Sequence, residues 1–211
     1  MPTVVKSTSR KNYSPKVEEE INDLIKHLWG VSRTYTYLSS LCQAQSNLRG
    51  FRQYFHLCAI RSRRNADRLT QYQIVRGGLV DMDEVKPIEH LSAYDPIGIC
   101  KFLFIAFDME KRVEQWVREV HDLAETKRDI LTTEFVELHC LCNQMRMIKM
   151  IVYHLQLICS YPTGWMYEND EPTMRELVGD LLGTTRAKPE PALLPETLMT
   201  VPFGNRPLFM K

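Results

Sequence analysis

The chain has 211 residues, with 27 Lys plus Arg against 26 Asp plus Glu, six Cys and 44% hydrophobic residues, a composition typical of globular proteins. A chain of this length buries roughly 70% of the surface that it exposes when unfolded, so its core needs no disulfides or metal ions. A formal net charge of +1 excludes a globally basic nucleic-acid-binding protein and an acidic disordered chain. Local clusters of charge have to be considered separately.

Localisation and cysteine chemistry follow from a few simple patterns. Residues 1–15 contain no apolar run of the signal-peptide type, and no stretch of 18 apolar residues occurs in the chain. The six cysteines lie in helical patterns without a CxxC or CxxH motif, which argues against a zinc site. We therefore predict a cytoplasmic protein with no membrane partner and with free, mostly buried thiols. The alternative for the cysteines is that some of them join subunits.

Four long segments carry apolar residues at three- and four-residue spacing, which predicts four amphipathic helices. These segments cover residues 18–42, 48–76, 96–120 and 131–159. The first two are separated by a few residues and the last two by a short turn at 127–129, so each pair is expected to be antiparallel. The connection at 79–95 is long enough to cross the bundle, which makes the second and third helices parallel.

The predicted fold class is therefore all-α, a four-helix bundle with one long crossover. We place an N-terminal extension at residues 1–15, the bundle at 16–183 and an extended Pro-rich tail at 184–211. A short fifth helix is expected around 172–182, behind an Asn or Asp cap. Five prolines between 187 and 211 exclude a helix in the tail.

Several local strings, taken in their order along the chain, resemble the ferritin family. They are Asn12-Tyr13, Tyr35-Thr-Tyr-Leu-Ser, Phe51-Arg-Gln-Tyr-Phe55, Arg76-Gly-Gly78, Met109-Glu-Lys-Arg-Val113 and Glu134-Phe-Val-Glu137. The resemblance covers about residues 12–160. It implies a homo-oligomer, or co-assembly with other ferritin subunits, in a hollow 24-subunit shell whose bundles each contain a di-iron ferroxidase centre.

The family's iron centre requires Glu side chains and a Glu-x-x-His pair, since residues three apart project together from one helix face. At the matching positions of the second helix the chain has Ser62 and Asn65, preceded by Arg61. In the first helix the family's glutamate falls at Leu28 or Gly30, depending on the placement of a small offset. The resemblance therefore implies a degenerate site at these positions.

Glu110 and Gln144 match the remaining glutamate and glutamine of the family's centre. We regard them as residual metal positions that are not occupied, because the permanent charge of Arg61 opposes two iron cations. An inward-facing Glu110 is expected to pair with an arginine and to form hydrogen bonds with Asn65 and Gln144. We therefore predict no ferroxidase activity, no required cofactor and at most weak iron binding.

Glu134 and Glu137 lie three residues apart on the fourth predicted helix and match the acidic residues that line the threefold channels of ferritin shells. The resemblance thus implies a channel that attracts divalent cations. The alternative is an ordinary solvated helix face.

The second predicted helix is strongly basic, with seven arginines, a single acid (Asp67) and a net charge of +6 over residues 49–76. One face of this helix would line the cavity of a shell, where it could bind nucleic acid or another polyanion. The candidate residues are Arg61, Arg63, Arg64 and Arg68. The alternative is that these arginines pair with acids of neighbouring helices.

Three hypotheses for the function follow. The first is a non-catalytic ferritin-family cage subunit, with at most a structural role in iron storage and iron homeostasis. The second is a chaperone or polyanion-binding cage similar to the artemins, which are ferritin-like, contain cysteines and lack a usable ferroxidase centre. The third is an active iron-binding ferritin with rearranged ligands.

Overall fold

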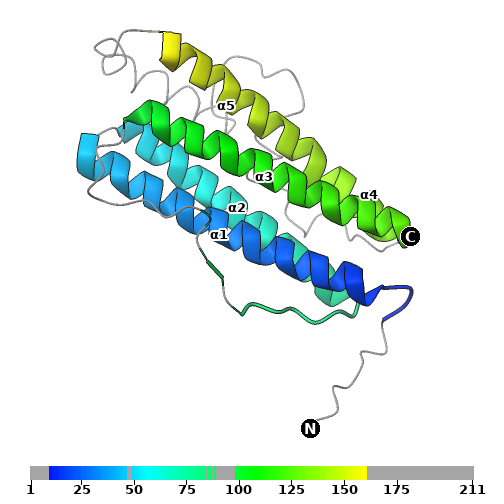
Figure 1. Ribbon diagram of the computed structural model, residues 1–211. Coiled ribbons are helices and arrows are strands. Elements are labelled where there is room, and N and C mark those ends of the chain that lie inside the picture. The colour runs from blue at the N-terminus through cyan, green and yellow to red at the C-terminus, as the bar shows by residue number, and fades with distance from the viewer. Residues whose placement is uncertain (1–9, 47–48, 84, 87, 89–97, 161–211) are drawn as a thin grey trace, which may run out of the picture.

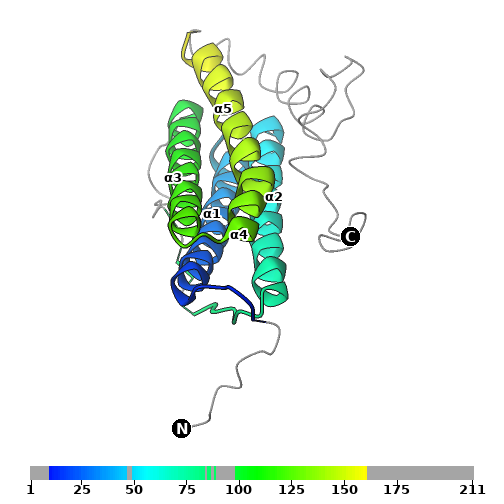
Figure 2. The same cartoon turned by 90° about the vertical axis from the view of Figure 1, so that its right-hand side faces the viewer.

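The chain forms a bundle of long helices packed side by side (Figures 1 and 2). The computed structural model describes residues 10–46, 49–83, 85–86, 88 and 98–160, and these contain no strand. The helices are α1 (Pro15–Ser46), α2 (Arg49–Val75), α3 (Ile99–Thr126) and a fourth one made of α4 (Ile130–Val136), η1 (Glu137–Leu141) and α5 (Cys142–Ser160). The predicted all-α four-helix bundle is confirmed.

Residues with a left-handed backbone or a capping side chain lie at several ends of the helices. Gly77 follows α2 with a φ of 74°, and its N–H donates to the carbonyl oxygen of Ile74 at 3.0 Å. The turn after α3 places Arg128 in the left-handed region, with a φ of 56°. The carboxylate of Asp129 then caps α4 by accepting the N–H of Thr132 at 3.3 Å.

The crossover between α2 and α3 runs back along α1 (Figure 1). Early in the crossover, Asp81 accepts a hydrogen bond from Lys26 Nζ at 2.6 Å. Further on, the N–H of Ile88 donates to Thr34 Oγ1 at 3.1 Å. Residue numbers rise together along the crossover and along α1 in these two contacts. The crossover therefore runs toward the C-terminal end of α1, which is the end of the bundle where α2 begins. α2 and α3 are consequently parallel, as the length of the connection predicted.

The fourth helix contains a π-helical segment that the sequence analysis missed. Within η1 the backbone hydrogen bonds span five residues instead of four, and the N–H of Cys142 donates to the carbonyl oxygen of Glu137. Such segments are rare and occur often at functional sites. η1 therefore changes the angular relation between the side chains of α4 and those of α5.

Five cysteines with described side chains are free thiols, and their burial differs more than expected. Cys42 and Cys58 are buried, Cys100 and Cys140 are half-buried, and Cys142 is exposed. Burial raises the pKa of Cys58 and that of Cys140 to about 12, so both remain protonated and unreactive at neutral pH. Intersubunit bonding by the remaining cysteines stays an untested alternative.

Several predicted features fall outside the described residues. These are the fifth helix at 172–182, the Pro-rich tail at 184–211 and most of the extension at 1–15. In the part of the chain that the structure does describe, no helix combines the length and the apolar character that a membrane span requires.

A buried network of charged and polar groups ties α2 to the start of α4. Arg76 Nη1 and Nη2 donate to the two carboxylate oxygens of Asp129 at 2.9 and 3.0 Å, and Nη1 also donates to Tyr72 Oη at 2.6 Å. The guanidinium reaches the N-terminal segment as well, because it donates to the carbonyl oxygen of Asn12 at 3.2 Å and lies over the ring of Tyr13. Arg76 therefore links three segments that are distant in sequence.

We expect Asp129→Ala to lower the free energy of unfolding by about 3–5 kcal/mol, because it leaves the charge of Arg76 buried without its partner. Urea denaturation followed by circular dichroism measures the change. Asp81→Ala is the matched control, since it removes an exposed carboxylate paired with Lys26 and should have a much smaller effect. Equal losses in the two variants would show that the Arg76 network does not stabilise the bundle.

Candidate functional site

Four polar side chains, one from each helix of the bundle, meet in the interior. Tyr35 comes from α1, Arg61 from α2, Glu110 from α3 and Gln144 from α5. Glu110 is fully buried and the Arg61 side chain is only 4% exposed. A carboxylate and a guanidinium at this depth have to satisfy one another, because water is not available to solvate them.

The carboxylate of Glu110 is saturated by the other three side chains. Its Oε1 pairs with Arg61 Nη2 and accepts a hydrogen bond from Tyr35 Oη at 2.7 Å. Its Oε2 accepts from Gln144 Nε2, which also donates to the backbone carbonyl oxygen of Glu110 at 2.8 Å. The predicted pairing of Glu110 with an arginine and with Gln144 is confirmed, and Arg61 is that arginine.

The protonation states of the cluster follow from burial and charge. Burial raises the pKa of Tyr35 well above its usual range, and the negative charge of Glu110 adds to the effect, so the phenol remains a donor. Burial alone would lower the pKa of Arg61, but the charge of Glu110, the neighbouring Tyr35 and Cys58 and the hydrogen bond to Glu110 together hold that pKa above its ordinary value. Tyr35 therefore stays protonated and Arg61 stays charged at physiological pH.

The structure distinguishes between the two positions considered for the family's glutamate on α1. Leu28 is buried in the bundle, and its carbonyl oxygen accepts a hydrogen bond from Ser62 Oγ at 2.8 Å. Gly30 instead lies against the crossover, where an added Cβ would come within 2.3 Å of the carbonyl oxygen of Lys86. Leu28 thus contacts Ser62 inside the bundle, whereas Gly30 packs against the crossover.

Asn65 does not behave as predicted. It is half-buried and forms no hydrogen bond with Glu110, whose two carboxylate oxygens bind Arg61, Tyr35 and Gln144. Among the described residues, no two further His, Cys, Asp or Glu side chains approach Glu110 closely enough to form a three-ligand metal site with it.

The structure also corrects the arginine face expected on α2. Arg61 and Arg68, two turns apart, are both buried and so cannot lie on an open surface. Arg63 and Arg64 are exposed, and the guanidinium of Arg63 stacks over the ring of Trp29 at 5.1 Å from its centroid. Of the four candidates, only Arg63 and Arg64 are accessible to a polyanion.

Glu134 and Glu137 both lie on the surface of the fourth helix. Glu137 Oε1 lies 2.9 Å from His121 Nε2 on α3, and this hydrogen bond raises the pKa of His121. A single chain contains only its own part of a threefold channel, so the role of the two glutamates as channel residues remains a prediction.

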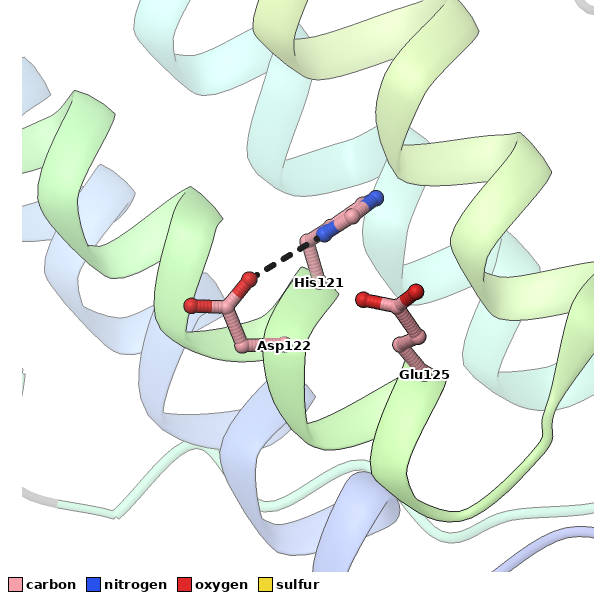
Figure 3. Close-up of side chains that lie close together, drawn as sticks. All are labelled: His121, Asp122 and Glu125. Atoms are coloured by element: carbon pink, nitrogen blue, oxygen red, sulfur yellow. Dashed lines mark hydrogen bonds and ion pairs between the residues drawn. The ribbon is translucent and has the colours of Figure 1, made fainter.

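Close to this contact lies a group that the sequence analysis missed, formed by His121, Asp122 and Glu125 near the end of α3 (Figure 3). A ligand atom from each residue lies within 4.8 Å of the others, and among the described residues this is the single such group of three. The four-residue spacing of His121 and Glu125, which places both on one helix face, could have revealed it.

We expect the buried ion pair to behave as a unit when mutated. Glu110→Leu should lower the free energy of unfolding by about 3–5 kcal/mol, because it leaves Arg61 charged and unpaired in the interior. The double variant Arg61→Leu with Glu110→Leu should recover most of this loss, since it buries no uncompensated charge. Denaturant titrations of the wild type, both single variants and the double variant measure the coupling, and strictly additive losses would contradict it.

Comparison with known proteins identifies the relatives of this chain. A family model described as a ferritin-like domain matches residues 18–159. The chain is 29% identical over 150 residues to a chloroplastic ferritin of Phaseolus vulgaris, a match that covers 69% of this chain and 58% of that protein. It is also 28% identical over 152 residues to the middle subunit of Salmo salar ferritin, covering 72% of this chain and 85% of that subunit.

The plant relatives correct the predicted localisation and show how much of their length this chain spans. Chloroplastic ferritin-1 of Pisum sativum is likewise 29% identical over 150 residues, covering 69% of this chain and 58% of that protein. The chain therefore spans less than three fifths of the length of these plant relatives. The predicted cytoplasmic localisation is wrong by this comparison, because the plant relatives are named as chloroplastic proteins.

Proposed function

The chain belongs to the ferritin family, and we propose that it is a cage subunit without ferroxidase activity, whose contribution to iron storage is structural. Ferritin-family proteins form oligomeric shells that store iron. The observation that carries the proposal is the saturation of the Glu110 carboxylate by Arg61, Tyr35 and Gln144.

Iron oxidation at a dinuclear centre requires several negative charges around two adjacent cations. In this interior the charge of Glu110 is already neutralised by Arg61. A metal ion that displaced the guanidinium would leave it buried and unpaired, which costs several kcal/mol. The neighbouring positions Leu28, Ser62 and Asn65 offer no carboxylate or imidazole to compensate.

The proposed assembly is a homo-oligomer, or a mixed shell with other ferritin subunits, of 24 chains. It is supported by the complete bundle and by exposed apolar side chains on the fourth helix. Four of them, Leu131, Leu138, Met145 and Tyr153, are 49–63% exposed and spaced by seven or eight residues. Apolar side chains that recur along one helix in this way suit a contact between subunits. In such a shell Glu134 and Glu137 would attract cations at the channels without performing chemistry on them.

We expect the full chain to consume Fe(II) in air no faster than buffer does. Oxygen uptake measured with an electrode tests this, and saturable uptake by the wild type would establish the alternative of an active ferritin with rearranged ligands. Ser62→Glu with Asn65→His should remain inactive while Arg61 is present. Adding Leu28→Glu and Arg61→Glu should produce saturable uptake in a variant whose circular dichroism remains helical, because these changes supply the missing carboxylates.

The polyanion-binding alternative is supported by the exposure of Arg63 and Arg64 within residues 49–76, a segment whose sequence carries a net charge of +6. Binding to a single-stranded oligonucleotide should weaken with salt, and Arg63→Gln with Arg64→Gln should reduce the slope of log K against log salt concentration by roughly 1. Arg118→Gln, an exposed arginine on α3 that pairs with Glu114, is the control and should leave the slope unchanged. Fluorescence anisotropy measures both, and identical slopes in all proteins would remove this alternative.

A further inference from the structure

We propose that a pocket between α1, α3 and the crossover binds a small organic anion that carries an aromatic ring. The pocket has a volume of about 370 Å³, a size typical of small-molecule sites. The two helices provide two of its walls, and the crossover, which runs along α1 (Figure 1), provides the third. The lining residues are Asp23, Lys26 and His27 of α1, Lys86 and Ile88 of the crossover, and Arg112 and Trp116 of α3.

The wall formed by the crossover is held in place by hydrogen bonds to α1. Arg33 Nη1 donates to the carbonyl oxygen of Val85 at 2.7 Å, and the N–H of Ile88 donates to Thr34 Oγ1 at 3.1 Å. These two bonds lie on either side of Lys86 along the chain. The backbone that carries the Lys86 side chain is therefore anchored, and the pocket is formed before a ligand arrives, as small-molecule sites usually are.

Two stacked rings form most of the apolar lining. The imidazole of His27 lies over the indole of Trp116, with the ring centroids 4.0 Å apart and an interplanar angle of 10°. Burial lowers the pKa of His27, so the imidazole is neutral at neutral pH and adds aromatic surface rather than charge. The half-buried side chain of Ile88 extends this surface from the crossover. An aromatic ring of a ligand can pack against it in an offset-stacked or edge-to-face arrangement.

The charged part of the lining favours an anion, because three cations and a single carboxylate, that of Asp23, line the pocket. Lys26 is engaged by Asp81 at 2.6 Å and lies 3.7 Å from Asp23. Arg112 and Lys86, both exposed, supply further positive charge from two different walls. A guanidinium binds carboxylate or phosphate oxygens through two parallel hydrogen bonds, and an ammonium adds a point charge. The pocket is therefore suited to a phosphate or carboxylate attached to a ring.

Isothermal titration of the full chain with naphthyl phosphate tests the proposal, and we expect saturable binding of one molecule per chain. Arg112→Gln should weaken binding by about 10- to 100-fold, because charge-assisted hydrogen bonds are lost. Trp116→Leu should weaken it by about 2- to 10-fold through the loss of ring packing. Asp23→Asn should tighten binding by about two- to threefold, because it removes a carboxylate that repels the ligand. A purely structural role of Asp23 would not produce tighter binding.

Matched controls separate this pocket from other basic surfaces. Arg118→Gln removes an exposed arginine of α3 that does not line the pocket, and it should leave the affinity unchanged. The double variant Arg63→Gln with Arg64→Gln removes the exposed arginines of α2 and should also have no effect. Inorganic phosphate and naphthol each carry one part of the probe, and both should bind at least tenfold more weakly than naphthyl phosphate.

Several results would overturn the proposal. Absence of saturable binding, or binding that Arg112→Gln and Arg118→Gln weaken equally, would show that the pocket is not the site. Inorganic phosphate or naphthol that binds as tightly as naphthyl phosphate would show that one part of the lining plays no role. Circular dichroism checks that each variant remains folded, and Arg112→Gln and Asp23→Asn change exposed residues, so they decide the question even if Trp116→Leu unfolds. The pocket does not depend on the proposed loss of ferroxidase activity, which oxygen uptake measures separately.

Discussion

The buried ion pair between Arg61 and Glu110 is the interaction on which the interior of the bundle depends. Removing two charges from water is expensive, and in the interior only good geometry and further hydrogen bonds offset the penalty. Tyr35 and Gln144 supply those hydrogen bonds from two other helices, so the pair fixes the relative register of all four. Arg61 Nε and Nη1 have no hydrogen-bond partner among the described residues, which leaves Glu110 as the main compensation for the charge.

The bundle geometry could be predicted from sequence because it depends on periodicity and on connection lengths. Apolar spacing located the helices, and the length of the connection after Gly78 gave the parallel arrangement of α2 and α3. The pairing of Glu110 with an arginine was also predictable, since a lone inward carboxylate requires a cation. Which arginine it was could not be predicted, because Arg61 and Arg64 share one side of the helix and a modest rotation of the helix decides which one faces inward.

Other features escaped prediction because they arise from tertiary contacts or from breaks in regular geometry. The position of Gly30 outside the site reflects the packing of the crossover against α1, which no local pattern encodes. The π-helical turn of η1 adds a residue to one turn and so disturbs the period on which sequence analysis depends. The contact between His121 and Glu137 joins two helices, and it depends on how those helices pack rather than on any local pattern.

Two polar contacts between α3 and the fourth helix show how burial assigns different roles to glutamate side chains of the same chemistry. Glu110 meets Gln144 in the interior, where desolvation makes an uncompensated charge so costly that the carboxylate is committed to Arg61. Glu137 meets His121 at the surface, where water stabilises the neighbouring charges of Asp122 and Glu125 and no internal cation is required. Carboxylates at the surface remain available to an incoming ion, whereas the one in the interior does not. A glutamate in the interior therefore joins α3 to the fourth helix only together with Arg61, whereas the glutamate at the surface does so without a buried cation.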